Sequence, residues 1–237
     1  MLDLEGYGPS ILEGALLTIQ VAFLSLALAL LLGIIGAVAK LSRNRIAHAI
    51  AVLYTTVIRG IPDLVLMLLI FFGGQVLINR LSDYIYAEFG IDYFVQVNPF
   101  IAGVLTIGFI FGAYMTETFR GAFQAVENGQ IEAGKAYGLS RWQIFSRIMC
   151  PQMVRHAIPG IGNNWLVLLK TTALVSIIGL YDMVRIASDA SKAVHEPFKF
   201  FIPVALIYLA LTAVSEITLH LLEKRYSAGV IRGGNNA

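Results

Sequence analysis

Long apolar runs constrain this chain more than any other feature. The stretch from Gly14 to Ala39 contains no charged residue, and crossing the hydrocarbon core of a bilayer takes only about 20 helical residues. Of all residues, 57% are hydrophobic and 14% are charged, and the mean hydropathy is +0.75. A soluble domain needs many more charges on its surface. The sequence therefore predicts an all-α integral membrane protein.

Five segments are long and apolar enough to span the membrane. We expect spans at about 12–39, 49–78, 99–119, 160–181 and 199–222, all within a single transmembrane domain that covers residues 1–237. The loop of about 120–159, between the third and fourth spans, is the longest polar passage. Within the third span, Gly108 and Gly112 would let a neighbouring helix approach closely.

The distribution of Lys and Arg predicts the orientation, because cytoplasmic loops carry an excess of these residues. Eleven of the 17 basic residues fall in the first link, in or beside the 120–159 loop, or in the tail: Lys40, Arg43, Arg45, Arg120, Lys135, Arg141, Arg147, Arg155, Lys224, Arg225 and Arg232. The alternate loops hold fewer basic residues and many acids, namely Arg80, Arg185, Lys192 and Lys199 with Asp83, Glu88, Asp92, Asp182, Asp189 and Glu196. We therefore expect a multi-pass protein with its N-terminus outside and its C-terminus and the 120–159 loop in the cytoplasm.

The polar passage from Glu127 to His156 predicts two short helices rather than one. Residues 131–137 are good helix formers, and Gly138 can adopt the left-handed conformation that closes a helix. Ser140 then stands three residues before Gln143, which is the spacing of a capping box.

The second short helix is expected from Arg141 to about Met149. Pro151 has no backbone donor and is expected to end it. Apolar residues recur along it at helical spacing while the arginines point elsewhere. The apolar set is Trp142, Phe145, Ile148 and Met149, and the basic set is Arg141 and Arg147. Such a helix can dock against a soluble partner.

Gly129 to Ala136 differs by one letter from the phosphate-binding pattern G-x-x-x-x-G-K-[ST]. Ala136 stands where that pattern needs a hydroxyl for magnesium, no strand is predicted before the loop, and the residues between the glycines look helical. We therefore expect this chain to bind no nucleotide and no other cofactor. The histidines have no ligand spacing, and Cys150 is the only cysteine, so neither a catalytic residue nor a metal site is expected.

The sequence predicts an interruption of the second span at R-G-I-P-D, because Pro62 cannot donate a helical hydrogen bond and Gly60 loosens the turn. Arg59 and Asp63 flank this point near mid-membrane. Interrupted helices with charges at that depth form the sites of many transporters. Alternatively, the two residues neutralise each other across one helical turn. The two interpretations are compatible.

Two further charges lie within predicted spans, where each must be paired or hydrated because charge is costly at that depth. Glu117 precedes Arg120 by three residues, so a local ion pair is expected. Lys170 has no acid nearby in the sequence, which favours a position facing a cavity or another helix. With Arg59 and Asp63, Glu117 and Lys170 are the candidates for a substrate pathway.

Several motifs resemble those of a known family. E-A-G-K-A-Y-G followed by I-M-C-P is similar to the E-A-A…G…I-x-L-P motif of the membrane subunits of bacterial ABC importers, with Gly134 and Cys150 as departures. R-G-I-P, P-G-I-G-N-N-W and K-T-T-A-L-V-S-I-I-G-L resemble the polar amino-acid permeases. R-G-I-P-D-L-V-L-M-L-L-I-F and Y-M-T-E-T-F-R-G-A-F resemble the HisQ-type subunits of importers for histidine and other basic amino acids.

The resemblance implies a type I importer (MetI-like) permease fold with five spans in the bacterial inner membrane and a cytoplasmic coupling helix. It implies three protein partners: a second permease chain, with a related hetero-partner favoured over a homodimer; a dimer of ATP-binding subunits that holds the ATP and magnesium; and a periplasmic amino-acid-binding protein. The residues implied in ATPase coupling are Glu132, Ala133, Gly138, Arg141 and Pro151. No nucleic acid is implied.

The implied function is ATP-driven import of polar amino acids, with Asp63 or Glu117 setting a preference for histidine, arginine or lysine. A stand-alone secondary transporter or channel for amino acids is the alternative. It would use the same buried charges but would not need a cytoplasmic two-helix loop, and five spans do not divide into equal inverted halves.

Overall fold

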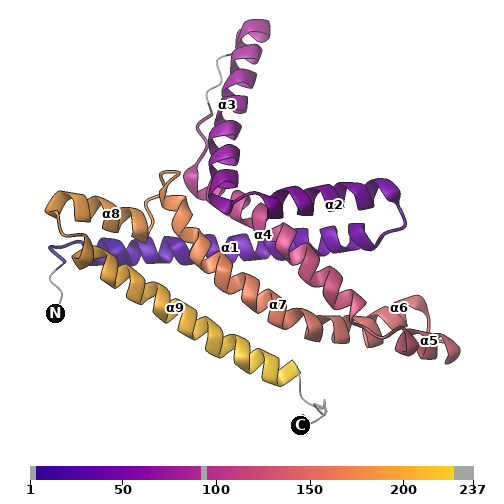
Figure 1. Ribbon diagram of the computed structural model, residues 1–237. Helices are drawn as coiled ribbons and strands as arrows, with labels where there is room; N and C mark the ends of the chain where they lie inside the picture. The colour runs from indigo at the N-terminus through magenta and orange to yellow at the C-terminus, as the bar shows by residue number, and fades with distance from the viewer. Residues whose placement is uncertain (1–3, 92–94, 227–237) are drawn as a thin grey trace.

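The computed structural model describes residues 4–91 and 95–226, so Asp92 and Arg232 lie outside the described part. That part contains helices and no strand (Figure 1). Its elements in chain order are α1 (Gly8–Leu41), α2 (Arg45–Gly60), α3 (Asp63–Phe89), α4 (Pro99–Gln124), α5 (Asn128–Ala136), α6 (Arg141–Ile144), the π-helical turn η1 (Phe145–Met149), α7 (Cys150–Thr171), the 3₁₀ helix η2 (Thr172–Ser176), α8 (Met183–Val194) and α9 (Pro197–Tyr226).

Four described helices are long and apolar enough to cross a membrane: α1, α3, α4 and α9. Many of their large apolar side chains face outward; the side chains of Leu31 and Leu209, for example, are 57% and 64% exposed. An outward apolar surface is stable where hydrocarbon replaces water as the solvent. The expectation of an all-helical membrane protein is confirmed.

The core is built on the crossing of α1 and α4, with α7 packed beside them (Figure 1). Close approach depends on glycine: a Cβ at Gly108 would lie 2.6 Å from Leu28 Cδ2, and one at Gly112 would lie 2.8 Å from Leu32 Cβ. The prediction that Gly108 and Gly112 admit a close neighbour is confirmed; that neighbour is α1 at both glycines, and at Gly112 also Tyr54 of α2.

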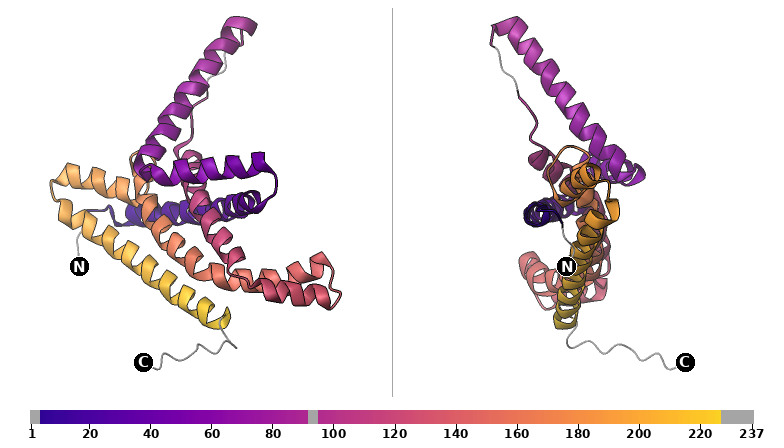
Figure 2. Two further views of the ribbon diagram at one scale, coloured as in Figure 1. Left: turned by 45° about the vertical axis from the view of Figure 1, so that its right-hand side comes forward. Right: turned by 90° about the vertical axis from the view of Figure 1, so that its left-hand side faces the viewer.

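The apolar run expected as the span 49–78 is broken into two helices. Ile61 and Pro62 are both extended, with ψ of 138° and 135°, because a residue before proline is pushed out of the α region and Pro62 has no donor to continue α2. After the break, α3 leaves the body in a new direction (Figure 2) and continues to Phe89, well beyond residue 78.

The chain between 150 and 194 also differs from expectation. The helix expected from about 160 begins at Cys150 and ends at Thr171. An additional helix, α8, follows where the sequence analysis placed only a loop. Its Met183 and Ala187 are buried with Ile11 of α1 and Phe200 of α9. Apolar side chains on one face of a short, charge-bearing helix suffice to pack it between two longer helices.

Candidate functional site

The polar passage folds into a helical pair that projects from the body. We call the segment from Asn128 to Met149, which contains α5, α6 and η1, the helical knob. Figures 1 and 2 show it beyond the far ends of α4 and α7, at the opposite end of the molecule from α8 and the start of α1. The knob is joined to α7 by a side-chain hydrogen bond from Gln152 to Gln130.

Two glycines shape the turn of the knob for different reasons. Gly138 has a φ of 77°, so the left-handed closure predicted from the sequence is confirmed. A Cβ there would meet no atom within 4 Å, so the backbone rather than space requires glycine. At Gly134, by contrast, a Cβ would lie 2.9 Å from Ile148 Cδ1 and 3.3 Å from Ile144 Cγ1. Gly134, which stands where the family motif has alanine, therefore lets α5 pack closely on α6 and η1.

The second half of the knob starts as predicted and ends differently. Ser140 accepts a hydrogen bond from the Gln143 backbone, and the Gln143 side chain accepts one from the Ser140 backbone, so the capping box is confirmed. The expectation that Pro151 ends this helix is wrong. The chain stays helical from Arg141 through Thr171, and Cys150 N–H bonds to Phe145 O in a wide π turn. The π turn contains one residue more than a normal helical turn and lies just before Pro151. The wider turn accommodates this proline, which has no backbone N–H to donate.

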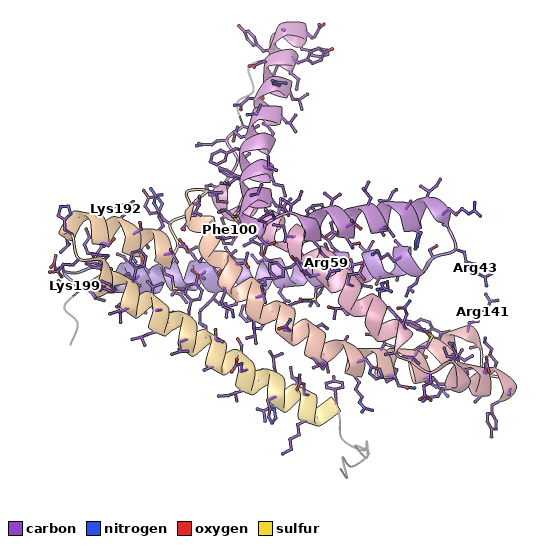
Figure 3. The ribbon with its side chains drawn as sticks, viewed as in Figure 1. Arg43, Arg59, Phe100, Arg141, Lys192 and Lys199 are labelled. Atoms are coloured by element: carbon purple, nitrogen blue, oxygen red, sulfur yellow. The ribbon has the colours of Figure 1, made fainter. Side chains whose placement is uncertain are left out.

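The predicted coupling residues all lie on the surface of the helical knob or at its junction with α7. Glu132, Ala133, Gly138, Arg141 and Pro151 are exposed. Large aromatic side chains accompany them: Tyr137 is 87% exposed, and Trp142 is 72% exposed and stacks on Phe145 at 5.8 Å between ring centroids. Figure 3 shows Arg141 at the outer end of the projection. Exposed aromatic residues beside arginine are typical of protein interfaces.

The segment that resembles a phosphate-binding loop is helical in the structure. Gly129 and Gly134 are both within α5, and the residues between them are helical, as expected from their composition. A phosphate-binding loop instead turns its backbone N–H groups toward the ligand, whereas the N–H groups of a helix interior already bond within the helix.

Arg59 and Asp63 lie on either side of the break, in the last turn of α2 and the first turn of α3. No ion pair joins them in the described chain, so mutual neutralisation on one helix face is wrong. Arg59 instead stacks over the ring of Tyr114 on α4, 5.4 Å from its centroid. Tyr114 is also within electrostatic range of Asp63. The break thus brings two opposite charges to one aromatic side chain of α4.

Glu117 has two ion-pair partners, one more than the sequence indicated. The predicted pair with Arg120 is confirmed, with 2.8 Å between Arg120 Nε and Glu117 Oε2. The other carboxylate oxygen pairs with Lys40 at the end of α1, and the two side chains are only 11% and 18% exposed. Glu117 therefore ties α1 to α4.

Lys170 is separate from these groups. It is exposed in the last turn of α7, and none of the ion pairs among the described residues includes it. The structure thus brings Arg59 and Asp63 together around Tyr114, which precedes Glu117 by one turn of α4. Lys170 lies apart from them on α7.

Comparison with known proteins agrees with this architecture. The family described as "Binding-protein-dependent transport system inner membrane component" matches residues 16–228. This chain belongs to that family. It is 53% identical to the histidine/lysine/arginine/ornithine transport system permease protein HisQ of Salmonella typhimurium, over 97% of this chain and 98% of the relative. The HisQ-type resemblance of the sequence is confirmed.

Solved structures show the same permease fold. The structure described as an amino acid ABC transporter with histidines is 31% identical, with a TM-score of 0.79 over 94% of this chain and 97% of that one. An inward-facing form of the MetNI methionine ABC transporter is only 14% identical, with a TM-score of 0.64 over 92% of this chain and 94% of that one, and it shows the fold alone.

In this permease, three polar residues that the fold brings to buried or half-buried positions were not identified from the sequence. The sequence indicated Lys40 only as a positive charge in a loop, but its ammonium group forms an ion pair with Glu117 that joins α1 to α4. Asp182 was assigned to an outer loop, yet it is fully buried. Asn164 donates to Thr118 Oγ1 at 3.0 Å between α7 and α4. An amide in the middle of an apolar helix is a signal that could have identified Asn164, because polar side chains in membrane spans bond across helices.

Proposed function

We propose that this permease is the membrane-spanning subunit of an ATP-driven importer for polar, chiefly basic, amino acids such as histidine, arginine and lysine. A periplasmic binding protein delivers the substrate, and a separate dimer of ATP-binding subunits holds ATP and magnesium. Support for the substrate class comes from the HisQ relative, whose described substrates are histidine, lysine, arginine and ornithine.

The proposal includes five spans, formed by α1, by α2 with α3, by α4, by α7 and by α9. The N-terminus lies in the periplasm, and the C-terminus and the helical knob lie in the cytoplasm. Two features support this orientation: the excess of Lys and Arg in the 120–159 loop and its alternate links, and the position of the knob at the opposite end of the molecule from α8 (Figure 1).

The observation that carries the proposal is the shape and surface of the helical knob. It is short, it is closed at Gly138 and capped at Ser140, and its second half continues directly into α7. A rigid-body movement of a docked ATPase would therefore reach α7 without passing through a flexible link. Its exposed Trp142 supplies an anchor of the kind that dominates binding energy in protein interfaces.

Co-purification of the ATP-binding subunit tests this role. Glu132→Arg reverses a charge on the exposed face of α5 and is expected to abolish or strongly weaken retention of that subunit. Glu88→Arg is a matched control, because Glu88 is also an exposed helical acid but lies at the far end of α3. Equal retention in the wild type, the Glu132 variant and the control would contradict the coupling assignment.

Substrate preference is assigned to the charges beside the break. Glu117 already carries two cationic partners, whereas Asp63 is half-buried next to Arg59 and Tyr114. We therefore expect Asp63→Asn to change the preference among histidine, arginine and lysine more than Glu117→Gln does. Competition uptake assays with assembly verified for each variant measure this. Unchanged selectivity in both variants would assign discrimination to the binding protein instead.

The partner permease is proposed to be a related chain rather than a second copy, as the HisQ-type resemblance implies. Expression of this chain alone with the ATP-binding subunit distinguishes the two arrangements. A stable, ATP-hydrolysing complex without another permease would favour the homodimer.

The alternative function is a stand-alone secondary transporter or channel, which would also use charges beside a broken helix. Uptake driven by an ion gradient in vesicles that contain only this chain would support it. The projecting knob favours the importer, because such a transporter has no use for an exposed aromatic surface outside the membrane.

A further inference from the structure

A hollow lies between α1 and α2, with Phe109 of α4 at its floor. It encloses about 530 Å³. Small residues of both helices form much of its wall, and aromatic side chains close its base. Its lining includes Gly36 and Ala39 of α1, Ala47 and Ala51 of α2, and Tyr54 and Phe109.

The base of this hollow is rigid and offers few polar atoms to a ligand. The hydroxyl of Tyr54 donates to the backbone oxygen of Phe109, so its hydrogen-bonding capacity is used within the protein. The two rings also pack together, with 4.9 Å between their centroids. An occupant therefore meets hydrocarbon surface over most of the hollow.

A second hollow continues the first along α1. It encloses about 420 Å³ and shares Leu32 and Phe109 with the first, and Leu28 and Ile70 line its other end. From Ala39 to Leu28, α1 rises about 16 Å at 1.5 Å per residue. One leaflet contributes roughly 15 Å of hydrocarbon, half of the bilayer core. The joined hollows, which we call the α1–α2 groove, therefore match the length of one acyl chain.

The first hollow extends over about 10 Å of α1, between Leu32 and Ala39. A single flexible hydrocarbon chain can follow the hollow over this length. A helix of the partner permease is the competing occupant, and the cysteine cross-link described below detects it.

The end of the groove next to the α1–α2 link is basic. Arg43 lies in the link between α1 and α2, Arg45 is the first residue of α2, and both are exposed; Figure 3 shows Arg43 at this link. Neither arginine takes part in the ion pairs of the described residues. The nearby Lys40 is already occupied by Glu117. Two cations at the mouth of an apolar groove complement a molecule that has an anionic head and an apolar tail.

We propose that the α1–α2 groove binds one anionic phospholipid, with an acyl chain along α1 and its phosphate at Arg43 and Arg45. Basic clusters beside a membrane-spanning helix attract anionic headgroups at about 1 kcal/mol per residue. The lipid would fill the gap between α1 and α2 and hold α2 in place on α4. This site does not depend on which side of the membrane the link faces or on the nature of the transported substrate.

Native mass spectrometry of the detergent-solubilised importer complex, loaded with phosphatidylglycerol or phosphatidylethanolamine, tests the site. We expect preferential retention of phosphatidylglycerol. The double variant Arg43→Gln, Arg45→Gln is expected to weaken that retention roughly 30-fold, as two such charges imply. Ala47→Phe, which fills the groove without changing charge, is expected to abolish it.

Matched controls separate the site from general lipid adhesion. Lys192→Gln removes an exposed cation from α8, and Ala210→Phe adds the same ring to an exposed position of α9; both are expected to retain the lipid. Equal retention of the two lipids, or equal retention in the groove variants and the controls, would overturn the proposal. So would a disulfide cross-link between Ala47→Cys and a cysteine on the partner permease, made in a Cys150→Ser background, because it would place protein in the groove.

Discussion

Replacing Asp182 by asparagine should remove a pH-dependent cost from the fold. Asp182 caps α8: its Oδ1 accepts from Arg185 N at 3.0 Å, while its Oδ2 is buried without a hydrogen-bond partner in the described structure. The residue is fully buried, against Gly14 of α1, and the titratable group within electrostatic range is Tyr208 of α9. Burial raises the pKa of Asp182 from 3.8 to about 6.

The sign of the effect follows from the direction of this pKa shift. A carboxyl whose pKa is higher in the folded state binds its proton more tightly there, so it stabilises the fold at low pH. That contribution is fully present below pH 4 and is lost as the pH rises through about 6. A shift of about 2 pH units corresponds to about 3 kcal/mol. The wild type is therefore expected to lose about 3 kcal/mol of folding free energy between pH 4 and pH 8 through this residue.

Asparagine keeps the side-chain oxygen that caps α8 and cannot ionise. Asp182→Asn is expected to be more stable than the wild type at pH 8, by up to about 3 kcal/mol, and to differ little from it at pH 4. For a chain of this size, that difference corresponds to roughly 6–12 °C in melting temperature. Thermal unfolding of the purified complex between pH 4.5 and pH 8, followed by tryptophan fluorescence, measures it.

Asp189→Asn provides the control for this experiment. Asp189 lies on the same helix, but its side chain is 41% exposed and bonded to Arg185, so its replacement should leave the pH dependence in place. An Asp182→Asn variant that is less stable than the wild type at pH 8, or that keeps the full pH dependence, would refute this account of Asp182.

Three further substitutions probe the core and the helical knob. Gly36→Val should destabilise the fold by about 1–3 kcal/mol in thermal unfolding, because a Cβ there would lie 2.2 Å from Thr116 Oγ1; unchanged stability would contradict the tight α1–α4 contact. Glu117→Gln leaves Lys40 without its anionic partner and should lower the free energy of unfolding by about 2 kcal/mol, a value between those of exposed and buried ion pairs. A stability equal to that of the wild type in the same assay would show that this ion pair does not hold α1 against α4. Trp142→Ala should leave folding unchanged, since the side chain is 72% exposed, but weaken ATPase binding by about 2 kcal/mol, or roughly 30-fold; affinity equal to that of the wild type would remove Trp142 from the interface.

Features that depend on neighbouring residues were predictable from the sequence. The closure at Gly138, the capping box at Ser140 and the Glu117–Arg120 pair all involve residues at most a few positions apart. The interruption at Pro62 was predictable for the same reason, since proline acts on its own helix and on the residue before it. For the candidate site, the exposed surface of the knob follows from these local signals.

Features that depend on packing were not predictable. The pair between Lys40 and Glu117 joins residues far apart in the chain, and the stacking of Arg59 on Tyr114 requires α2 to lie against α4. The burial of Asp182 depends on how α1 and α9 enclose the start of α8. The helix through Pro151 misled local reasoning because a π turn relieved the constraint that proline normally imposes.

The helical knob is proposed to transmit ATP-driven motion to the spans. Uptake of a labelled basic amino acid, measured together with ATP hydrolysis in liposomes that contain the whole importer and its binding protein, tests it most directly. Gly138→Val forces a branched side chain into left-handed backbone, whereas Gly129→Val adds the same side chain where there is open space and φ is not positive. Gly138→Val is expected to abolish ATP-driven uptake, whereas Gly129→Val is expected to retain it. Full coupled uptake in the Gly138→Val variant, or uptake that needs no ATPase, would contradict this role of the knob.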